Sequence, residues 1–162
     1  MKNENRECCP EFNPKKWDEV SLYWDNKQFI KESVPTLFHI PFPPMIGKKI
    51  TKMMKIAEES NAVLGNLEDV LLLFSDPSPF KSELYLSVEK TVPSANNVRI
   101  SGNFVGKVFD GPYNAIPKFI KKMDGYLVEI DKKSKIYYVH YAYCPKCAKK
   151  FGHNYMILFA KV

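Results

Sequence analysis

The chain has 162 residues, of which 45% are hydrophobic and 14% are aromatic, and its formal net charge is +6. A chain of this length can bury a substantial core as one domain, and no apolar run approaches the roughly 20 residues that span a bilayer. The lysines are scattered in short groups rather than gathered in one basic block, which argues against direct contact with nucleic acid. Residues 1–12 lack the apolar segment of a signal peptide, so we expect a cytoplasmic protein with no membrane contact.

The N-terminal part of the chain is polar at first and then rich in aromatic residues. Residues 1–33 are interpreted as an arm packed on the rest of the protein, and residues 17–30 favour a strand or hairpin that buries Trp17 and Trp24. A single globular unit is expected over residues 34–162. Its first half predicts a strand over residues 34–42, an amphipathic helix over 45–61, and strands over 70–74 and 83–88.

The second half opens with a strand, a turn and a helix. Residues 98–109 have the β-branched and aromatic content of a strand, and Asp110-Gly111-Pro112 is typical of a turn, in which Gly tolerates a positive φ. The next helix carries apolar residues at helical spacing, with Asn114 as its predicted N-cap and Pro117 in its first turn. The rest predicts a strand over residues 135–143, a loop over 144–154 with at most one helical turn, and a closing strand over 155–162.

These elements follow the order strand, helix, strand, strand twice, which predicts an α+β fold with a tandem βαββ repeat and two long helices. The block Val108–Met123, VFDGPYNAIPKFIKKM, resembles the signature of the GyrI-like small-molecule-binding family, where a Gly-Pro-Tyr turn opens the second long helix. The resemblance implies a stand-alone bacterial member with an antiparallel sheet. It also implies a central cleft that binds small hydrophobic, aromatic or cationic compounds, for sequestration or sensing, as in multidrug-binding regulators of that family.

Glu83 is the leading candidate for chemistry. The resemblance implies a pocket glutamate that pairs with cationic aromatic ligands, because a carboxylate in apolar surroundings is costly unless it is paired. A second hypothesis is catalysis, in which a desolvated glutamate with a raised pKa acts as general acid or base. The third is an ordinary solvent-exposed glutamate, since the alternation of residues 83–88 does not say which face is buried.

Several aromatic residues and one histidine are expected to line the pocket with Glu83. They are Phe38, His39, Trp24, Tyr85, Tyr113 and Tyr141, although each of them alone is more often a core or cross-strand residue. The family is also similar to hydrolases that open strained, DNA-alkylating cyclopropane natural products. That resemblance implies a hydrolase with Glu83 as general base and Tyr113 or Tyr85 as the orienting hydroxyl.

The four cysteines offer a separate local signal. Cys144-Pro145-Lys146-Cys147 is half of a typical zinc site, and Cys8 with Cys9 could complete it, with His153 as a substitute ligand. A structural zinc ion would give the polar arm a reason to be ordered. A redox dithiol and ordinary structural thiols are the two other interpretations.

A zinc-stabilised module that contacts another protein, such as a gyrase subunit, is the third functional hypothesis. Such a module would need an exposed apolar patch and no cavity. In each of the three hypotheses the chain is expected to be a monomer or a homodimer.

Overall fold

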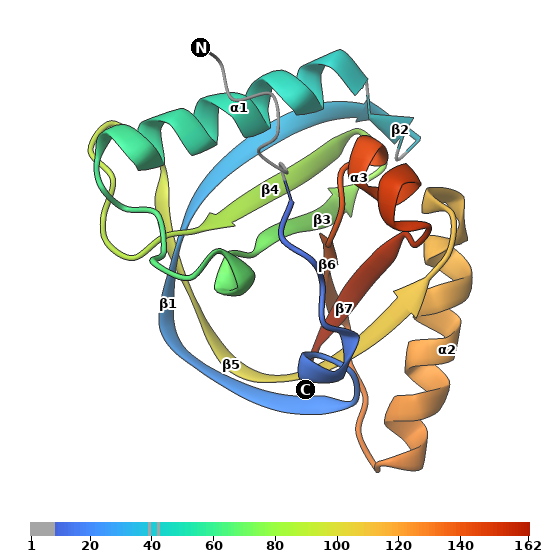
Figure 1. Cartoon of the computed structure of the whole chain (residues 1–162). Coiled ribbons are helices and arrows are strands. Elements are labelled where there is room, and N and C mark those ends of the chain that lie inside the picture. Colours follow the sequence, from blue (N-terminus) through green and yellow to red (C-terminus); the bar gives the residue numbers. More distant parts are fainter. Residues whose placement is uncertain (1–8, 39, 42) are drawn as a thin grey trace. The chain divides into compact units, whose positions relative to one another are not determined.

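Two long strands, β1 (Val20–Leu37) and β5 (Asn97–Asp110), cross the boundary between two structural units of the chain. The structure is a computed structural model that describes residues 9–38, 40–41 and 43–162 (Figure 1). The central unit comprises Tyr23–Asn103, and the terminal unit combines Met1–Leu22 with Phe104–Val162. The expected boundary between residues 33 and 34 falls inside β1, which is one unbroken strand.

The central unit is an antiparallel sheet covered on one face by a helix. β1 pairs with β4 (Lys81–Ser87), and β4 pairs with β3 (Leu72–Ser78), while the short β2 (Ile40–Pro41) pairs with the end of β1. Helix α1 (Pro43–Glu59) lies along this sheet (Figure 1). Its buried residues Met53 and Ala57 form a core with residues of the strands, namely Ile30, Val34, Leu84 and Leu86.

The register of β1 and β4 decides which side chains face α1. Leu84 lies opposite Glu32, and both point to the helix, because Leu84 belongs to its core and Glu32 pairs with lysines of α1. Successive residues of a strand point to opposite faces. Glu83 and Tyr85 therefore lie on the other face, where they are also buried.

The terminal unit repeats the same strand order. β7 (Tyr155–Lys161) pairs antiparallel with both β5 and β6 (Ile136–Tyr141), so the last strand lies between the first and the middle one, as β4 does in the central unit. Helix α2 (Ile116–Glu129) buries Phe119, Met123 and Leu127. The described structure is therefore mixed α+β with antiparallel strands, which confirms the predicted fold class at that level.

The N-terminal segment, described from residue 9 onward, packs on the C-terminal part of its own unit. Its 3₁₀ turn Pro14–Lys16 is capped by the side chain of Asn13. Trp17 places its ring edge-on to Phe159, with 5.8 Å between ring centroids, and the backbone N–H of Val108 donates to the carboxylate of Asp18 over 3.0 Å. The segment is thus attached by both apolar and polar contacts.

Three local predictions were wrong. The strands predicted over residues 17–30 and 34–42 are largely one strand, β1, because Pro35 lies at the end of the β1–β4 ladder, where a missing N–H donor is tolerated. Asn114 does not cap α2, since it lies in a 3₁₀ turn and Ala115 holds the cap position without a side-chain bond. The loop after residue 144 contains a seven-residue helix, α3 (Pro145–Phe151), which ends at the left-handed Gly152.

The sequence suggested that Gly111 is needed for a positive φ, but the structure requires a glycine there for a different reason. It is not among the described residues with a positive φ. A Cβ atom at this position would lie 2.8 Å from Cζ of Phe119, whose ring stacks on Phe109 at 4.8 Å between centroids. The glycine therefore lets the end of β5 approach the first turns of α2 closely.

No described helix is both long and apolar enough to cross a membrane.

We expect Gly111→Ala to lower the free energy of unfolding by about 1–3 kcal/mol, because the stacked Phe119 ring has to shift to accept a methyl group. Urea unfolding checks this. Gly125→Ala is the matched control, since a Cβ at Gly125 of α2 meets nothing within 4 Å and the added methyl favours a helix. An unchanged stability of Gly111→Ala would contradict the role given to the close approach.

Candidate functional site

A buried carboxylate network lies on the face of the central sheet opposite α1. Glu83 of β4 accepts a short hydrogen bond from the hydroxyl of Tyr85, two residues along the same strand. Lys31 of β1 places its Nζ 2.9 Å from the Oε2 of Glu83, and Lys81 places its Nζ 3.2 Å from the Oε1. Both carboxylate oxygens of Glu83 are therefore paired.

This network keeps Glu83 ionised although the residue is only 9% exposed. Burial alone would raise the pKa of Glu83, but the Tyr85 hydroxyl and the two ammonium groups outweigh it and hold the pKa at about 2, against an ordinary value of 4.5. The shift is opposite to the raised pKa expected for a general acid or base. The burial also disagrees with the interpretation of Glu83 as a solvent-exposed residue. Glu83 therefore carries a negative charge at neutral pH, and the ammonium groups of Lys31 and Lys81 pair with it.

Aromatic rings extend from this carboxylate. The ring of Tyr85 meets Phe29 edge-on at 6.3 Å between centroids, and Phe29 lies 6.0 Å from the indole of Trp24. The Nζ of Lys31 lies 5.5 Å from the centroid of the Tyr85 ring, which already places a cation over an aromatic face. Trp24 and Tyr85 were predicted from the sequence, whereas Phe29 and both lysines were not. Lys81 lies two residues before Glu83, so the alternation of β4 could have indicated it. Lys31 and Phe29 follow only from the strand register, in which they lie opposite Tyr85 and Ser87.

The other expected ligand-binding residues lie elsewhere or are not described. Phe38 is 70% exposed near the end of β1 and contacts Phe80, with 6.0 Å between ring centroids. His39 lies outside the described residues. Tyr113 and Tyr141 belong to the terminal unit, where their rings meet edge-on at 5.3 Å. Burial raises the pKa of Tyr113, and the neighbouring Cys144 and Cys9 raise it further.

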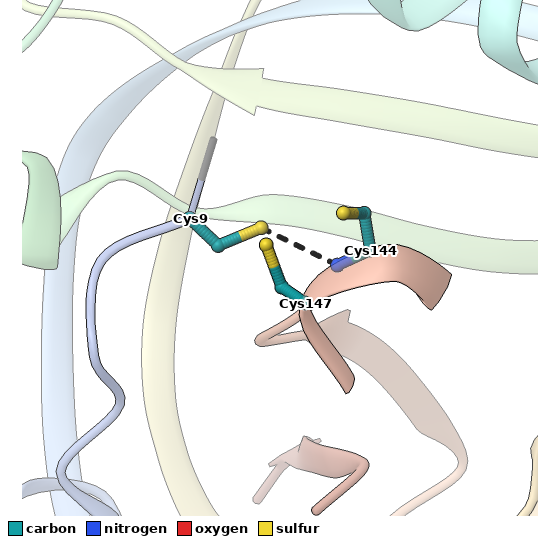
Figure 2. A group of neighbouring side chains, drawn as sticks. All are labelled: Cys9, Cys144 and Cys147. Atoms are coloured by element: carbon teal, nitrogen blue, oxygen red, sulfur yellow. Dashed lines mark hydrogen bonds between the residues drawn. The ribbon is translucent and has the colours of Figure 1, made fainter. Parts of the chain in front are cut away.

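Three cysteines gather in the terminal unit (Figure 2). The sulfur atoms of Cys9, Cys144 and Cys147 all lie within 4.8 Å of one another, and such a group could hold a metal ion. Cys144 caps α3 and Cys147 lies in its first turn, where it is buried. The backbone N–H of Cys144 donates to the Sγ of Cys9 over 3.4 Å.

His153, the expected substitute ligand, is not part of this group. Cys8 lies outside the described residues. The Nδ1 of His153 is 2.8 Å from the carboxylate of Asp110, and its ring stacks on Tyr155 at 4.8 Å between centroids. Burial would raise the pKa of Asp110, but His153 and the backbone N–H of Asn154 lower it overall. His153 therefore stabilises the turn at the end of β5 by pairing with Asp110.

A shallow groove of about 490 Å³ runs along the outer side of α1. It is lined by Pro44, Gly47, Lys48, Thr51, Lys52 and Lys55. None of the predicted ligand-binding residues lines it, and its three lysines make it unsuitable for a cation.

Two solved structures share the fold. One is an uncharacterised conserved protein from Listeria innocua, with a TM-score of 0.62 and 12% identity over 89% of this chain and 91% of that one. The other is SAV2435 bound to tetraphenylphosphonium, with a TM-score of 0.54 and 11% identity over 90% of this chain and 93% of that one. At these identities the likeness concerns the fold alone. The comparison with curated proteins gave no match.

The comparison with family models is more specific, because it rests on the sequence. The model of the family described as bacterial hydrolase matches residues 1–162, which include both the Glu83 network and the cysteine group. The chain therefore belongs to the bacterial hydrolase family.

Proposed function

We propose that this protein binds small hydrophobic compounds that are aromatic and cationic, and that the Glu83 carboxylate recognises their positive charge. The observation that carries the proposal is a buried carboxylate that stays ionised and accepts a hydrogen bond from Tyr85, whose ring is followed by those of Phe29 and Trp24. A cation attracts such a carboxylate more strongly than it attracts one in bulk water, and it is also attracted to the faces of the rings.

The ligand needs a place beside a carboxylate that two lysines already pair. The side chain of Lys81 is 49% exposed, against 25% for Lys31. An exposed ion pair contributes little stability, so the Lys81 ammonium can return to water at small cost. The ligand cation then takes its position next to Oε1 of Glu83, while Lys31 and Tyr85 keep Oε2 fixed.

The fold comparison supports this choice of ligand class. SAV2435 is bound to tetraphenylphosphonium, a cation surrounded by four phenyl rings. The shared strand order of the two units also favours the interpretation of the chain as a tandem βαββ protein of the GyrI-like type. Sequestration or sensing of such compounds is the cellular role that we propose.

A hydrolase of reactive small molecules is the second candidate, and membership in the bacterial hydrolase family favours it. A carboxylate with a pKa of about 2 is a weak base, so Glu83 would act mainly by orienting water and by stabilising positive charge that develops on an electrophile. The hydroxyl of Tyr85, which donates to Glu83, would fix the direction of the carboxylate.

For the binding function, we expect Glu83→Gln to weaken the affinity for tetraphenylphosphonium by about tenfold or more, because the attraction to the fixed charge is lost. Titration calorimetry measures the affinity. Neutral triphenylphosphine oxide should bind the variant unchanged, which shows that the site remains folded. Glu32→Gln is the matched control, since Glu32 also pairs with two lysines but faces α1. An equal loss in both variants would reject the proposal.

For the ionisation of Glu83, we expect a stability difference that depends on pH. A folded-state pKa of about 2, below the ordinary 4.5, means that the ionised group stabilises the fold above pH 4.5 and that this contribution is lost as the pH falls to about 2. The gap in unfolding free energy between the native chain and Glu83→Gln should therefore shrink across that window. Urea unfolding at a series of pH values measures it. A constant gap would contradict the assigned ionisation.

For the second candidate, we expect the native chain to open strained cyclopropane electrophiles and Glu83→Gln to lose about 100-fold or more of the rate while it still binds them. The rate should stay flat from pH 4 to 8, since Glu83 remains ionised throughout. Mass-spectrometric product analysis follows the reaction. Binding without turnover by the native chain would reject the hydrolase and leave the binding function intact.

A further inference from the structure

We infer that Cys9, Cys144 and Cys147 bind one zinc ion, and that this ion fastens the N-terminal segment to helix α3. This inference is independent of the Glu83 site and of its proposed ligand. All three residues belong to the terminal unit, and Figure 2 shows the sulfur of Cys9 turned towards Cys147 and towards the start of α3.

The distances suit a single ion of this kind. Zinc bonds thiolate sulfur at about 2.3 Å, so two sulfurs on one tetrahedral zinc lie about 3.8 Å apart. The three sulfurs are already within 4.8 Å of one another, and rotations of the side chains bring them to that spacing. Three thiolates leave the fourth corner of the tetrahedron for water or for a further donor.

The local sequence explains how two of the ligands come together. Pro145 begins α3, so Cys144 precedes the first turn and Cys147 lies within it. The N–H of Cys144 points at the Sγ of Cys9, and this kind of outer contact orients the ligands of a metal.

The third ligand comes from a segment that is already held in place. The N–H of Phe12 donates to the hydroxyl of Tyr143 over 2.9 Å, and its ring lies 5.3 Å from that of Tyr155. Cys9 is 135 residues away from Cys144 in the sequence. A cross-link that closes such a long loop restricts the unfolded chain strongly, so the ion adds to the apolar and polar contacts that already attach this segment.

A redox dithiol explains the same residues less completely. A disulfide between Cys144 and Cys147 would use two of the three thiols and would require an oxidant to remove two electrons and two protons. The third sulfur at the same spacing, contributed by a distant segment, has no part in that chemistry. A metal ion uses all three.

The test measures zinc in the full-length protein purified in reducing buffer without chelator. We expect about one zinc per chain in the native protein and a loss of more than tenfold in Cys9→Ser and in Cys147→Ser. Lys146→Ala is the matched control, because it changes the same turn without removing a thiol, and it should keep its zinc. Cys9→Ser leaves α3 unaltered, and far-ultraviolet circular dichroism verifies that it is folded.

A second readout reports on the N-terminal segment. Removal of zinc with a strong chelator should speed hydrogen exchange of the amides around Phe12 by tenfold or more, while those of β7 stay protected. Cobalt(II) added to the zinc-free protein should give a thiolate charge-transfer band. A protein that binds neither ion, or a zinc-free chain lighter by two hydrogen atoms because of a disulfide, would overturn the inference. Exchange near Phe12 that is unaffected by the chelator would overturn the fastening role.

Discussion

The antiparallel ladder between β1 and β4 is the constraint on which the central unit depends. It sets Glu32 opposite Leu84 and Ser33 opposite Glu83, so that two carboxylates with two lysines each lie on opposite faces of one sheet. A shift of one residue would turn Glu83 towards α1 and bring the apolar residues of that face to the other side. The apolar contacts of α1 therefore fix the position of the anionic site, although they do not touch it.

Glu83 illustrates how a buried charge becomes tolerable. Removing a carboxylate from water costs several kcal/mol unless partners replace the lost hydration. Tyr85 and Lys31 supply such partners from within the sheet, and Lys81 supplies one from the solvent-facing end of β4. Lys81 is more exposed than Lys31 and therefore returns to water more readily. In the proposed binding mode, Tyr85 and Lys31 hold the carboxylate in place while a positive ligand replaces Lys81 at Oε1.

The elements with strong periodicity could be predicted from the sequence, and the contacts between distant segments could not. The apolar spacing of α2 located that helix, and the alternation of β4 separated Leu84 from Glu83. Alternation could not tell that both faces of β4 are buried, because that depends on what covers each face. The partner Lys31 of Glu83 follows only from the register, whereas Lys81 lies two residues before Glu83 on the same strand.

The cysteine group shows which contacts a local sequence motif can predict and which it cannot. The spacing of Cys144 and Cys147 favoured a zinc site or a redox dithiol but left ordinary structural thiols open, and the structure places both residues at the start of α3. The participation of Cys9 was a hypothesis based on residue type, because no local pattern connects segments 135 residues apart. His153 had a suitable type and spacing, but it pairs with Asp110.

The division of the chain into units has a consequence for the order of folding during synthesis. The central unit is one continuous stretch, Tyr23–Asn103, whereas the terminal unit needs residues from both sides of it. A ribosome releases the chain from its N-terminus, so the central sheet and α1 can assemble while α2 and β7 are still being made. Trp17 and Phe12 must wait for their partners Phe159 and Tyr155, which are translated more than 140 residues later. The nascent N-terminal segment therefore exposes Phe12 and Trp17 until β7 has been made, and exposed apolar surface of this kind favours aggregation during synthesis.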